Sequence, residues 1–265
     1  MIDATSLPVI VQTLKEPLCA RYIEGKRFPF LFQDKKLEEI GKSFGCQAQK
    51  VLPSIRYFVT IKTLWFDKQI QKFINKHPDG IVLNIGCGMD SRYFRLNNTR
   101  KIIWYDIDLP ETIKIKSSFI KETASYILVG KSILDDSWTE QIVKNKPTLC
   151  IAETVLMYFP EEEVKWILQL LHKKFPEGEL LIDVVDTFVV KHSAENPQLK
   201  SVGLSFLWGI KESSTITRWV KGLQILKEWR MRDIIRIYSL QSFFYALFVY
   251  LGDKNKTRIV HFKFT

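Results

Sequence analysis

Short apolar runs alternate with amphipathic stretches along the chain from residue 80 onward. The apolar runs are residues 81–85, 101–105, 126–129, 148–152 and 180–185. Strands that are buried on both faces, as in a parallel sheet, have continuous apolar runs of this length. Residues 160–175 instead repeat apolar side chains at helical spacing behind an acidic first turn. Strands that alternate with helices predict right-handed βαβ units, and therefore an α/β fold with a Rossmann-like, doubly wound sheet.

The pattern changes after the fifth run. Residues 186–222 are irregular, aromatic and polar, and long excursions at the carboxyl end of a parallel sheet typically build the ligand crevice. The pattern of residues 223–229 predicts a further strand. The length of the apolar stretch over 234–252, which ends at a glycine, predicts a buried helix. Residues 257–264 alternate between apolar and polar side chains, which predicts an antiparallel closing strand in a mostly parallel sheet.

The first 79 residues have a different character. Residues 6–23, 34–44 and 66–77 have helical patterns, and the last of these leads into a Pro-Asp-Gly turn. No stretch rich in glycine and serine separates this region from the rest of the chain. We therefore expect residues 1–79 to be a helical extension that packs on a Rossmann-like core formed by residues 80–265.

Composition favours one large domain in a reducing cytoplasm. The chain has 265 residues and is 46% hydrophobic, which is enough to bury a sizeable core. No window reaches the roughly 18 unbroken apolar residues of a membrane span, and the first residues lack the features of a signal peptide. Four cysteines, at positions 19, 46, 87 and 150, show neither metal-ligand spacing nor a dense disulfide framework. We expect Cys87 and Cys150 to be buried free thiols.

The net charge of +10 raises the question of a nucleic-acid partner. The basic residues are dispersed among acidic ones, and no run of five like charges occurs. A solvated basic surface is therefore a better interpretation than a phosphate-binding track, and we expect neither a nucleic acid nor a membrane as partner.

A glycine-containing segment, Val82–Leu96, joins the first predicted strand to the first predicted helix. Gly86 and Gly88 fall at the turn, where missing side chains let the backbone approach a ligand closely. About twenty residues later, the second predicted strand ends in Asp106 and Asp108. A carboxylate at that place can accept hydrogen bonds from both ribose hydroxyls of a nucleoside.

The residues around this turn favour a cationic nucleoside. A dinucleotide site has a third glycine or alanine where this chain has Ser91. Asp90 stands at the opening of the helix, where a carboxylate would repel a pyrophosphate but tolerate a cation. S-adenosylmethionine carries a sulfonium and an ammonium and no phosphate, so we expect it to be the cofactor.

Three segments in order resemble the leucine carboxyl methyltransferase family, and in particular its bacterial polyketide-type O-methyltransferase branch. They are LNIGCGMDSRYFRL, WYDIDLPETI and AETVLMYFPEEEV. VQTLKEPLCARYIEG near the start and FLWGIKESSTITRWVKGLQILKEW further on are similar to the same branch. The resemblance covers most of the chain and implies a class I S-adenosylmethionine-dependent methyltransferase.

The resemblance also implies roles for individual residues. Gly86 and Gly88 would line the methionine and ribose portions of the cofactor, and Asp90 would belong to the same wall. The ribose-binding acid of the family matches Asp108, while the position at the strand end alone would favour Asp106. Glu153 matches the family glutamate that faces the methionine end.

Two positions depart from the family pattern. Lys62 stands where relatives have an arginine that grips the cofactor carboxylate; it keeps the charge but loses the bidentate fork. Arg56 is the alternative for this role. The adenine-contact segment is often acidic in relatives, and here Ser132 or Asp135 is the candidate.

The predicted reaction is an in-line displacement that transfers a methyl group to a hydroxyl or carboxylate of a small molecule, aromatic or polyketide-like. Alignment of two reactants can supply about 7–11 kcal/mol, so we expect no metal, triad or nucleophile. A carboxylate acceptor needs no base, whereas a hydroxyl acceptor benefits from one, and His192 and Tyr158 are the candidates. Trp208 and Trp219 either line the acceptor pocket or belong to the core of residues 186–222. The alternatives are an RNA-directed methyltransferase and a non-enzymatic nucleoside-binding module.

Overall fold

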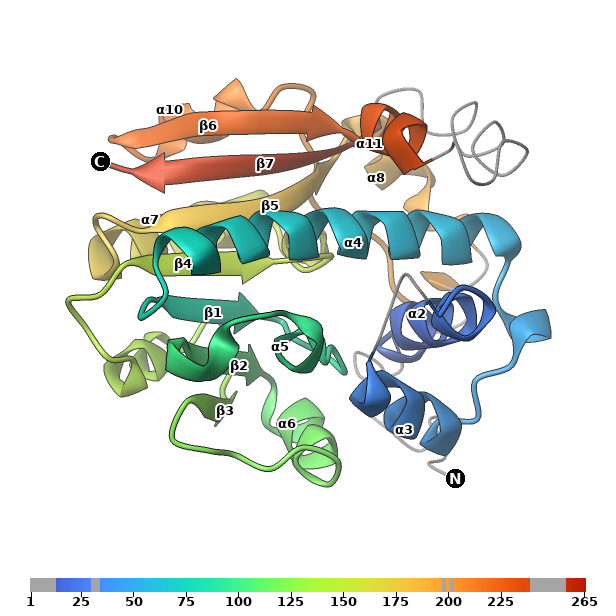
Figure 1. Ribbon diagram of the computed structural model, residues 1–265. Helices are drawn as coiled ribbons and strands as arrows, with labels where there is room; N and C mark the ends of the chain where they lie inside the picture. The colour runs from blue at the N-terminus through green and yellow to red at the C-terminus, as the bar shows by residue number, and fades with distance from the viewer. Residues whose placement is uncertain (1–12, 30–33, 197–198, 201–202, 239–255) are drawn as a thin grey trace.

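A seven-stranded sheet forms the centre of the computed structural model, which describes residues 13–29, 34–196, 199–200, 203–238 and 256–265 (Figure 1). The strands are β1 (Ile81–Ile85), β2 (Ile103–Asp108), β3 (Tyr126–Gly130), β4 (Thr148–Ala152), β5 (Glu179–Val185), β6 (Leu223–Arg230) and β7 (Thr257–Phe264). Their order in the sheet is β3-β2-β1-β4-β5-β7-β6. Neighbours among β1–β5 pair in parallel, whereas β7 is antiparallel to both β5 and β6. The predicted fold class is confirmed.

The positions of the strands follow the apolar runs closely. The predicted second strand, residues 101–105, is displaced: β2 begins two residues later because residues 99–101 form a 3-10 helix. The amide of Ile102 closes that turn on the carbonyl of Thr99, at 3.0 Å. The strand then runs on to Asp108, which lies beside Gly130 of β3. Asp108 therefore stands at the carboxyl edge of the sheet.

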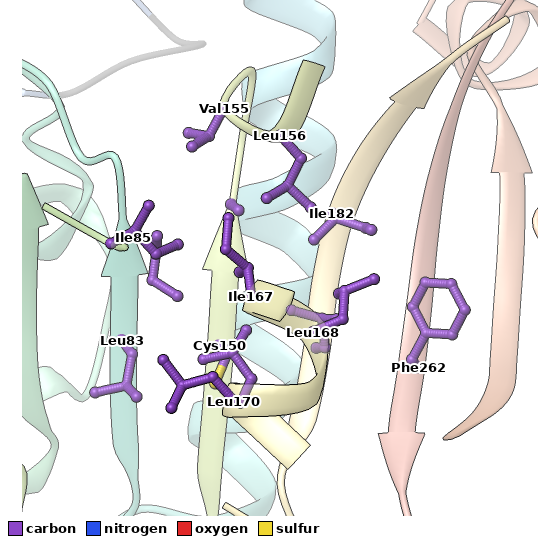
Figure 2. Close-up of a cluster of buried hydrophobic side chains, with 14 of the residues drawn as sticks. Leu83, Ile85, Cys150, Val155, Leu156, Ile167, Leu168, Leu170, Ile182 and Phe262 are labelled. Atoms are coloured by element: carbon purple, nitrogen blue, oxygen red, sulfur yellow. The ribbon is translucent and has the colours of Figure 1, made fainter. Parts of the chain in front are cut away.

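Both faces of the sheet are covered, which explains why its central strands are apolar throughout. On one face, α7 (Glu161–Lys174) and α10 (Ser214–Trp219) pack against Leu83, Ile85 and other strand residues (Figure 2). On the other face, α4 (Pro53–Lys76) and α11 (Met231–Tyr238) pack against Val82 and its neighbours. Successive residues of β1 thus belong to two separate cores.

The N-terminal helices lie beside the carboxyl end of the parallel strands (Figure 1). They are α2 (Lys15–Arg27) and α3 (Lys35–Ser43), and α2 packs against both α3 and α4. The side chain of Asp34 caps α3 by accepting from the amide of Leu37 at 2.9 Å. The predicted helix over 66–77 is the second half of the much longer α4, which begins at Pro53. The first part of the predicted helix over 6–23 lies outside the described residues.

A disulfide joins Cys19 of α2 to Cys46, which follows α3. The two Cα atoms are 5.1 Å apart, and the residues are separated by 27 positions in the sequence. The bond packs beside Ala20 and Val51 in a small apolar cluster, and Cys46 also contacts the larger core that contains α4. The cysteine spacing gave no indication of this pairing, because a single bond between a helix and a loop leaves no pattern in the sequence. Cys87 and Cys150 are buried free thiols, as expected.

The remaining elements connect the strands. Short helices follow β1, β2 and β5: α5 (Arg92–Arg95), α6 (Pro110–Ser117) and α8 (Thr187–Ser193). Single 3-10 turns occur at Ala48–Lys50, Thr99–Lys101, Asp136–Gln141 and Leu156–Tyr158. The predicted buried helix over 234–252 falls partly on α11, and its part beyond residue 238 lies outside the described residues. No helix within the described ranges is both long and apolar enough to span a bilayer.

Candidate functional site

The glycine turn after β1 is held in a conformation that requires glycine. Gly86 and Gly88 have φ angles of 61° and 49°, a region that residues with a Cβ seldom adopt. A Cβ on Gly86 would lie 2.4 Å from a methyl carbon of Val155, so the Val155 side chain, which follows β4, packs directly on the turn. The carboxylate of Asp108 accepts from the amide of Gly88 at 2.8 Å. The turn and the end of β2 are thus fixed to each other.

A cavity of about 470 Å³ opens beside this turn. Its walls come from α2, the first half of α4, the glycine turn, the residues after β4, and part of the segment 186–222. It brings together five of the residues that the sequence singled out for the cofactor: Lys62, Gly86, Gly88, Asp90 and Glu153. Its volume lies in the range of small-molecule sites.

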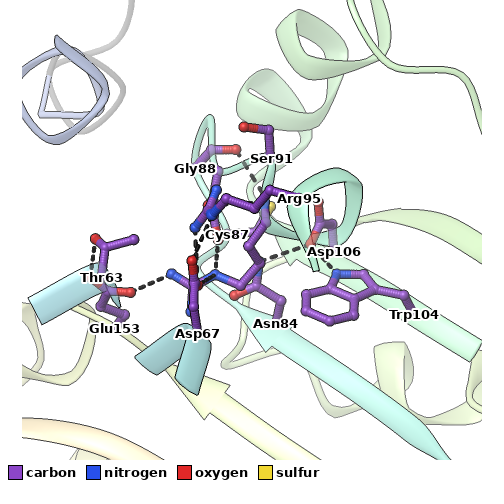
Figure 3. A network of polar contacts seen from close by, with 12 residues as sticks. Thr63, Asp67, Asn84, Cys87, Gly88, Ser91, Arg95, Trp104, Asp106 and Glu153 are labelled. Atoms are coloured by element: carbon purple, nitrogen blue, oxygen red, sulfur yellow. Dashed lines mark hydrogen bonds and ion pairs between the residues drawn. The ribbon is translucent and has the colours of Figure 1, made fainter. Parts of the chain in front are cut away.

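Acidic and basic side chains form a network of hydrogen bonds and ion pairs in and behind the cavity wall (Figure 3). Arg92 of α5 donates to Asp90 and also to Glu153, and Arg95 reaches Asp90 at 3.3 Å. Arg95 further grips Asp67 of α4 with two bonds, at 2.6 and 3.1 Å. The sequence predicts that the carboxylate of Asp90 repels a pyrophosphate and tolerates a cation; in the structure, the guanidinium groups of Arg92 and Arg95 pair with that carboxylate. The cause is the position of both arginines on α5, one helical turn apart.

Two of the carboxylates that line the cavity, Asp90 and Glu153, have lowered pKa values. Burial alone raises the pKa of Asp90, but Arg92 and Arg95 outweigh burial and hold that pKa far below its usual range. Burial likewise raises the pKa of Glu153, and Arg92 and Lys62 bring it below its ordinary value. Thr63 also donates to Glu153, at 3.1 Å. Glu153 therefore presents a fixed negative charge to the cavity.

Arg21 is a cavity residue that the sequence pattern did not reveal. It lies on α2, is 7% exposed, and its Nε has no hydrogen-bond partner among the described residues. Burial lowers the pKa of its guanidinium, while Asp90 and Glu153 oppose that effect by charge. A buried cation with an unused donor is costly, and this one lines a cavity where an anion would satisfy it.

Lys62 and Arg56 have partners within the protein. The ammonium of Lys62 is 2.6 Å from a carboxylate oxygen of Asp183 and also donates to the hydroxyl of Thr154. Arg56 pairs with Glu24 at 3.2 Å and donates to the carbonyl of Ala48 at 3.3 Å. Lys62 lines the cavity, whereas Arg56 does not.

Asp106 is the centre of a buried polar cluster (Figure 3). Its carboxylate accepts from Asn84 at 2.9 Å, from the indole of Trp104 at 2.8 Å and from Tyr126. Lys116 of α6 lies 2.5 Å from the same carboxylate. Asp106 is 1% exposed and does not line the cavity, so its geometry is that of a structural carboxylate.

Asp108, Ser132 and Asp135 lie beyond the cavity, where β2 and β3 end. Asp108 also accepts from the amide of Leu109 at 2.7 Å. Burial raises its pKa, and the bonds from the amides of Gly88 and Leu109 partly offset this. Ser132 and Asp135 lie in the turn after β3 and accept from the backbone amides of Leu134 and Ser137. These three side chains border the same sheet edge as the glycine turn.

The candidates for acceptor chemistry divide between the cavity and other places. Tyr158 lines the cavity, and its ring packs edge-on against Phe206. His192 is exposed and bonds to the carbonyl of Phe188 at 2.8 Å, outside the cavity. Trp208 belongs to the hydrophobic core, with Trp219 packed against it. In the described part of the chain, no cluster of three metal-ligand side chains occurs.

Comparison with known proteins identifies relatives over most of the chain. The sequence profile of the leucine carboxyl methyltransferase family matches residues 11–172. The chain is 26% identical over 235 residues to the tetracenomycin polyketide synthesis O-methyltransferase TcmP of Streptomyces glaucescens, a match that covers 88% of this chain and 87% of that protein. It is also 26% identical over 169 residues to the S-adenosyl-L-methionine-dependent methyltransferase dpfgK of Gibberella zeae, which covers 58% of this chain and 56% of that protein.

Solved structures share the fold at low sequence identity. A DUF574 family protein from Streptomyces avermitilis superposes with a TM-score of 0.61 at 8% identity, over 86% of this chain and 90% of the other. A methyltransferase-like protein from Thermobifida fusca, described as a putative methyltransferase, gives a TM-score of 0.57 at 10% identity, over 86% and 88% of the two chains. The sheet and its flanking helices thus have the class I methyltransferase architecture.

Proposed function

Since the chain belongs to the leucine carboxyl methyltransferase family and is an S-adenosylmethionine-dependent methyltransferase, we propose that it transfers a methyl group to an oxygen atom of a small, largely apolar acceptor. The observation that carries this proposal is the composition of the cavity. Its lining includes charged side chains, among them Arg21, Asp90, Arg92 and Glu153, together with the apolar side chains of Ile55, Phe58, Val59 and Phe206.

The charged part of the cavity fits the amino-acid portion of the cofactor. The Nε of the buried Arg21 lacks a hydrogen-bond partner within the described chain, and its guanidinium matches the carboxylate, whereas Glu153, whose pKa is lowered, matches the ammonium. The bare backbone at Gly86 and Gly88 permits close approach of the ribose and sulfur. Asp108 would accept from the ribose hydroxyls. This division of roles leaves Asp106 as a support for the sheet.

The adenine would lie at the end of β3, over Ser132 and Asp135. Both side chains are in the turn that follows β3, and β3 pairs with β2 beside Asp108. The adenosine therefore extends along the sheet edge away from the cavity, and the cavity remains for the methionine portion and the acceptor.

The protein contributes alignment and water exclusion to the reaction. The cofactor, when bound, supplies a methyl group that its sulfonium has already activated. Ile55, Phe58 and Val59 of α4 form an apolar wall with Phe206, so that water is excluded and the acceptor oxygen is held in line. Such alignment accounts for up to about 7–11 kcal/mol in favourable cases.

Tyr158 acts as a hydrogen-bond donor in this scheme. Burial raises the pKa of its hydroxyl, so the hydroxyl stays protonated at neutral pH and does not serve as a base. An acceptor that arrives ionised, such as a carboxylate, needs no base. The apolar wall and the name of the relative from Streptomyces glaucescens support a polyketide-like acceptor, aromatic in part, that presents such an oxygen.

Calorimetry with two ligands tests the proposal. The purified protein is titrated with S-adenosylhomocysteine and, separately, with NAD. We expect binding of the first alone, because the cavity offers matched charges for an amino acid and no site for a diphosphate. A producer-cell extract incubated with methyl-labelled cofactor should then yield a labelled small molecule. Binding of NAD without S-adenosylhomocysteine, or label found only in RNA, would contradict the proposal.

A further inference from the structure

Thr154, the second residue after β4, has a backbone conformation that its side chain disfavours. Its φ angle is 60°, in the left-handed region that a β-branched residue rarely adopts. Such a conformation persists only where surrounding contacts enforce it. The contacts of Thr154 therefore identify the residues that enforce its positive φ.

Lys62 and Asp183 enclose Thr154 from two sides. One oxygen of Asp183 accepts from the amide of Thr154 at 2.7 Å. The other oxygen lies 2.6 Å from the ammonium of Lys62, which in turn donates to the hydroxyl of Thr154. Side-chain exposure is 4% for Lys62 and 1% for Asp183. The three residues form a closed ring of charge-assisted bonds, in which Lys62 and Asp183 are buried and Thr154 is partly exposed.

The residues on either side of Thr154 face the cofactor site. Glu153 lines the cavity and binds Arg92 and Thr63. Val155 packs on Gly86 so closely that a Cβ there would have no room. The backbone conformation of Thr154 therefore decides where the glutamate points and how the glycine turn is supported.

We propose that Lys62 and Asp183 are positioning residues, which hold residues 153–155 so that Glu153 faces the amino-acid portion of the cofactor. Lys62 then acts on the cofactor through Thr154 and Glu153, and not by direct contact with the carboxylate. This inference rests on the proposed roles of the cavity. It differs from the role of the family arginine at this position, because the ammonium of Lys62 already has Asp183 and Thr154 as partners.

A Thr154→Gly substitution distinguishes positioning by Lys62 from direct contact between Lys62 and the cofactor carboxylate. Glycine adopts positive φ without a steric cost. A chain with glycine at position 154 therefore does not need the bonds from Lys62 and Asp183 to maintain the backbone conformation of residues 153–155. Four proteins are compared: wild type, Lys62→Met, Thr154→Gly and the double variant Lys62→Met/Thr154→Gly. Each is titrated with S-adenosylhomocysteine and with 5′-methylthioadenosine, which lacks the amino-acid portion.

If Lys62 positions residues 153–155, Lys62→Met weakens S-adenosylhomocysteine binding about tenfold or more and changes 5′-methylthioadenosine binding less than threefold. The double variant then binds S-adenosylhomocysteine within about threefold of Thr154→Gly. A double variant as weak as Lys62→Met would instead indicate direct contact and overturn the inference, as would a Lys62→Met variant with unchanged affinity.

Two further comparisons complete the design. If Lys62→Met fails to fold, as a melting scan would reveal, Asp183→Asn alone and with Thr154→Gly repeats the same comparison. Lys146→Met, which removes a surface ion pair with Asp79, is the matched control and should bind like wild type. Failure of the wild-type protein to bind S-adenosylhomocysteine contradicts the proposed function itself, which distinguishes that outcome from failure of this inference.

Discussion

Arg21→Met removes the guanidinium that we assign to the cofactor carboxylate and retains an unbranched side chain in the same space. A hydrogen bond between charged groups contributes about 1.5–3 kcal/mol. Since each 1.4 kcal/mol changes a dissociation constant tenfold, the affinity for S-adenosylhomocysteine should fall about 10- to 150-fold. The affinity for 5′-methylthioadenosine should not change, because that ligand has no carboxylate.

The same substitution should not destabilise the free protein. Arg21 is 7% exposed and its Nε has no hydrogen-bond partner in the described part of the chain, and a buried donor left without an acceptor costs about 1–3 kcal/mol. Removing it offsets the lost attraction to Asp90 and Glu153, which retain Arg92 as their main partner. Loss of affinity without loss of stability is the distinctive result.

Isothermal titration with the two ligands and a chemical denaturation curve measure both quantities. Arg27→Met is the matched control, because Arg27 is an exposed residue at the end of the same helix and lies outside the cavity. Equal weakening of both ligands by Arg21→Met would show that the helix has moved rather than that a carboxylate has lost its partner. Unchanged affinity for S-adenosylhomocysteine would refute the assignment.

Three other predictions concern the turn, the ribose and the disulfide. Gly86→Ala should lower the free energy of unfolding by about 1–3 kcal/mol and abolish measurable cofactor binding, because the new Cβ would lie 2.4 Å from a neighbouring methyl carbon at a φ of 61°. Since burial raises the pKa of Asp108, affinity for S-adenosylhomocysteine should fall with decreasing pH from above about 4, the ordinary aspartate value. Protonation removes the acceptor charge, so Asp108→Asn should bind more weakly at every pH and lose this dependence. Reduction of the bond between Cys19 and Cys46, 27 positions apart, should lower the free energy of unfolding by about 3.6 kcal/mol from loop entropy, as measured by denaturation with and without dithiothreitol. A Cys19→Ser/Cys46→Ser variant with wild-type stability would contradict that value.

The sheet was predictable because burial on both faces leaves a simple trace in the sequence. Residues 81–85, 148–152 and 257–264 coincide with β1, β4 and β7, since in each the apolar pattern and the structural element share their ends. The glycine turn was predictable for a related reason. Its conformation requires residues without side chains, and a sequence displays such residues directly.

The walls of the cavity were harder to predict from the sequence. Helix α4 turns Lys62, Thr63 and Asp67 inward toward the site, and these polar residues interrupt the apolar period that would have shown its full length. Arg21 has the appearance of a solvent-facing residue in an ordinary helix, and only the fold places it against Glu153. In both cases, the helix faces the interior with polar side chains at positions where an amphipathic helix has apolar ones.

The position of β7 affects the order in which a nascent chain can complete the sheet. Among the strands that the structure describes, β6 pairs with β7 alone, and β7 lies between β6 and β5. Residues 223–230 therefore leave the ribosome before the strand that will hold them exists, and β5 offers an open edge until residues 257–264 emerge. During that interval the incomplete chain exposes the unpaired edge of β5 to other chains, and an unpaired strand edge promotes aggregation. A ribosome stalled before residue 257 would therefore carry a chain in which β1–β5 are paired and the outer edge of β5 is uncovered.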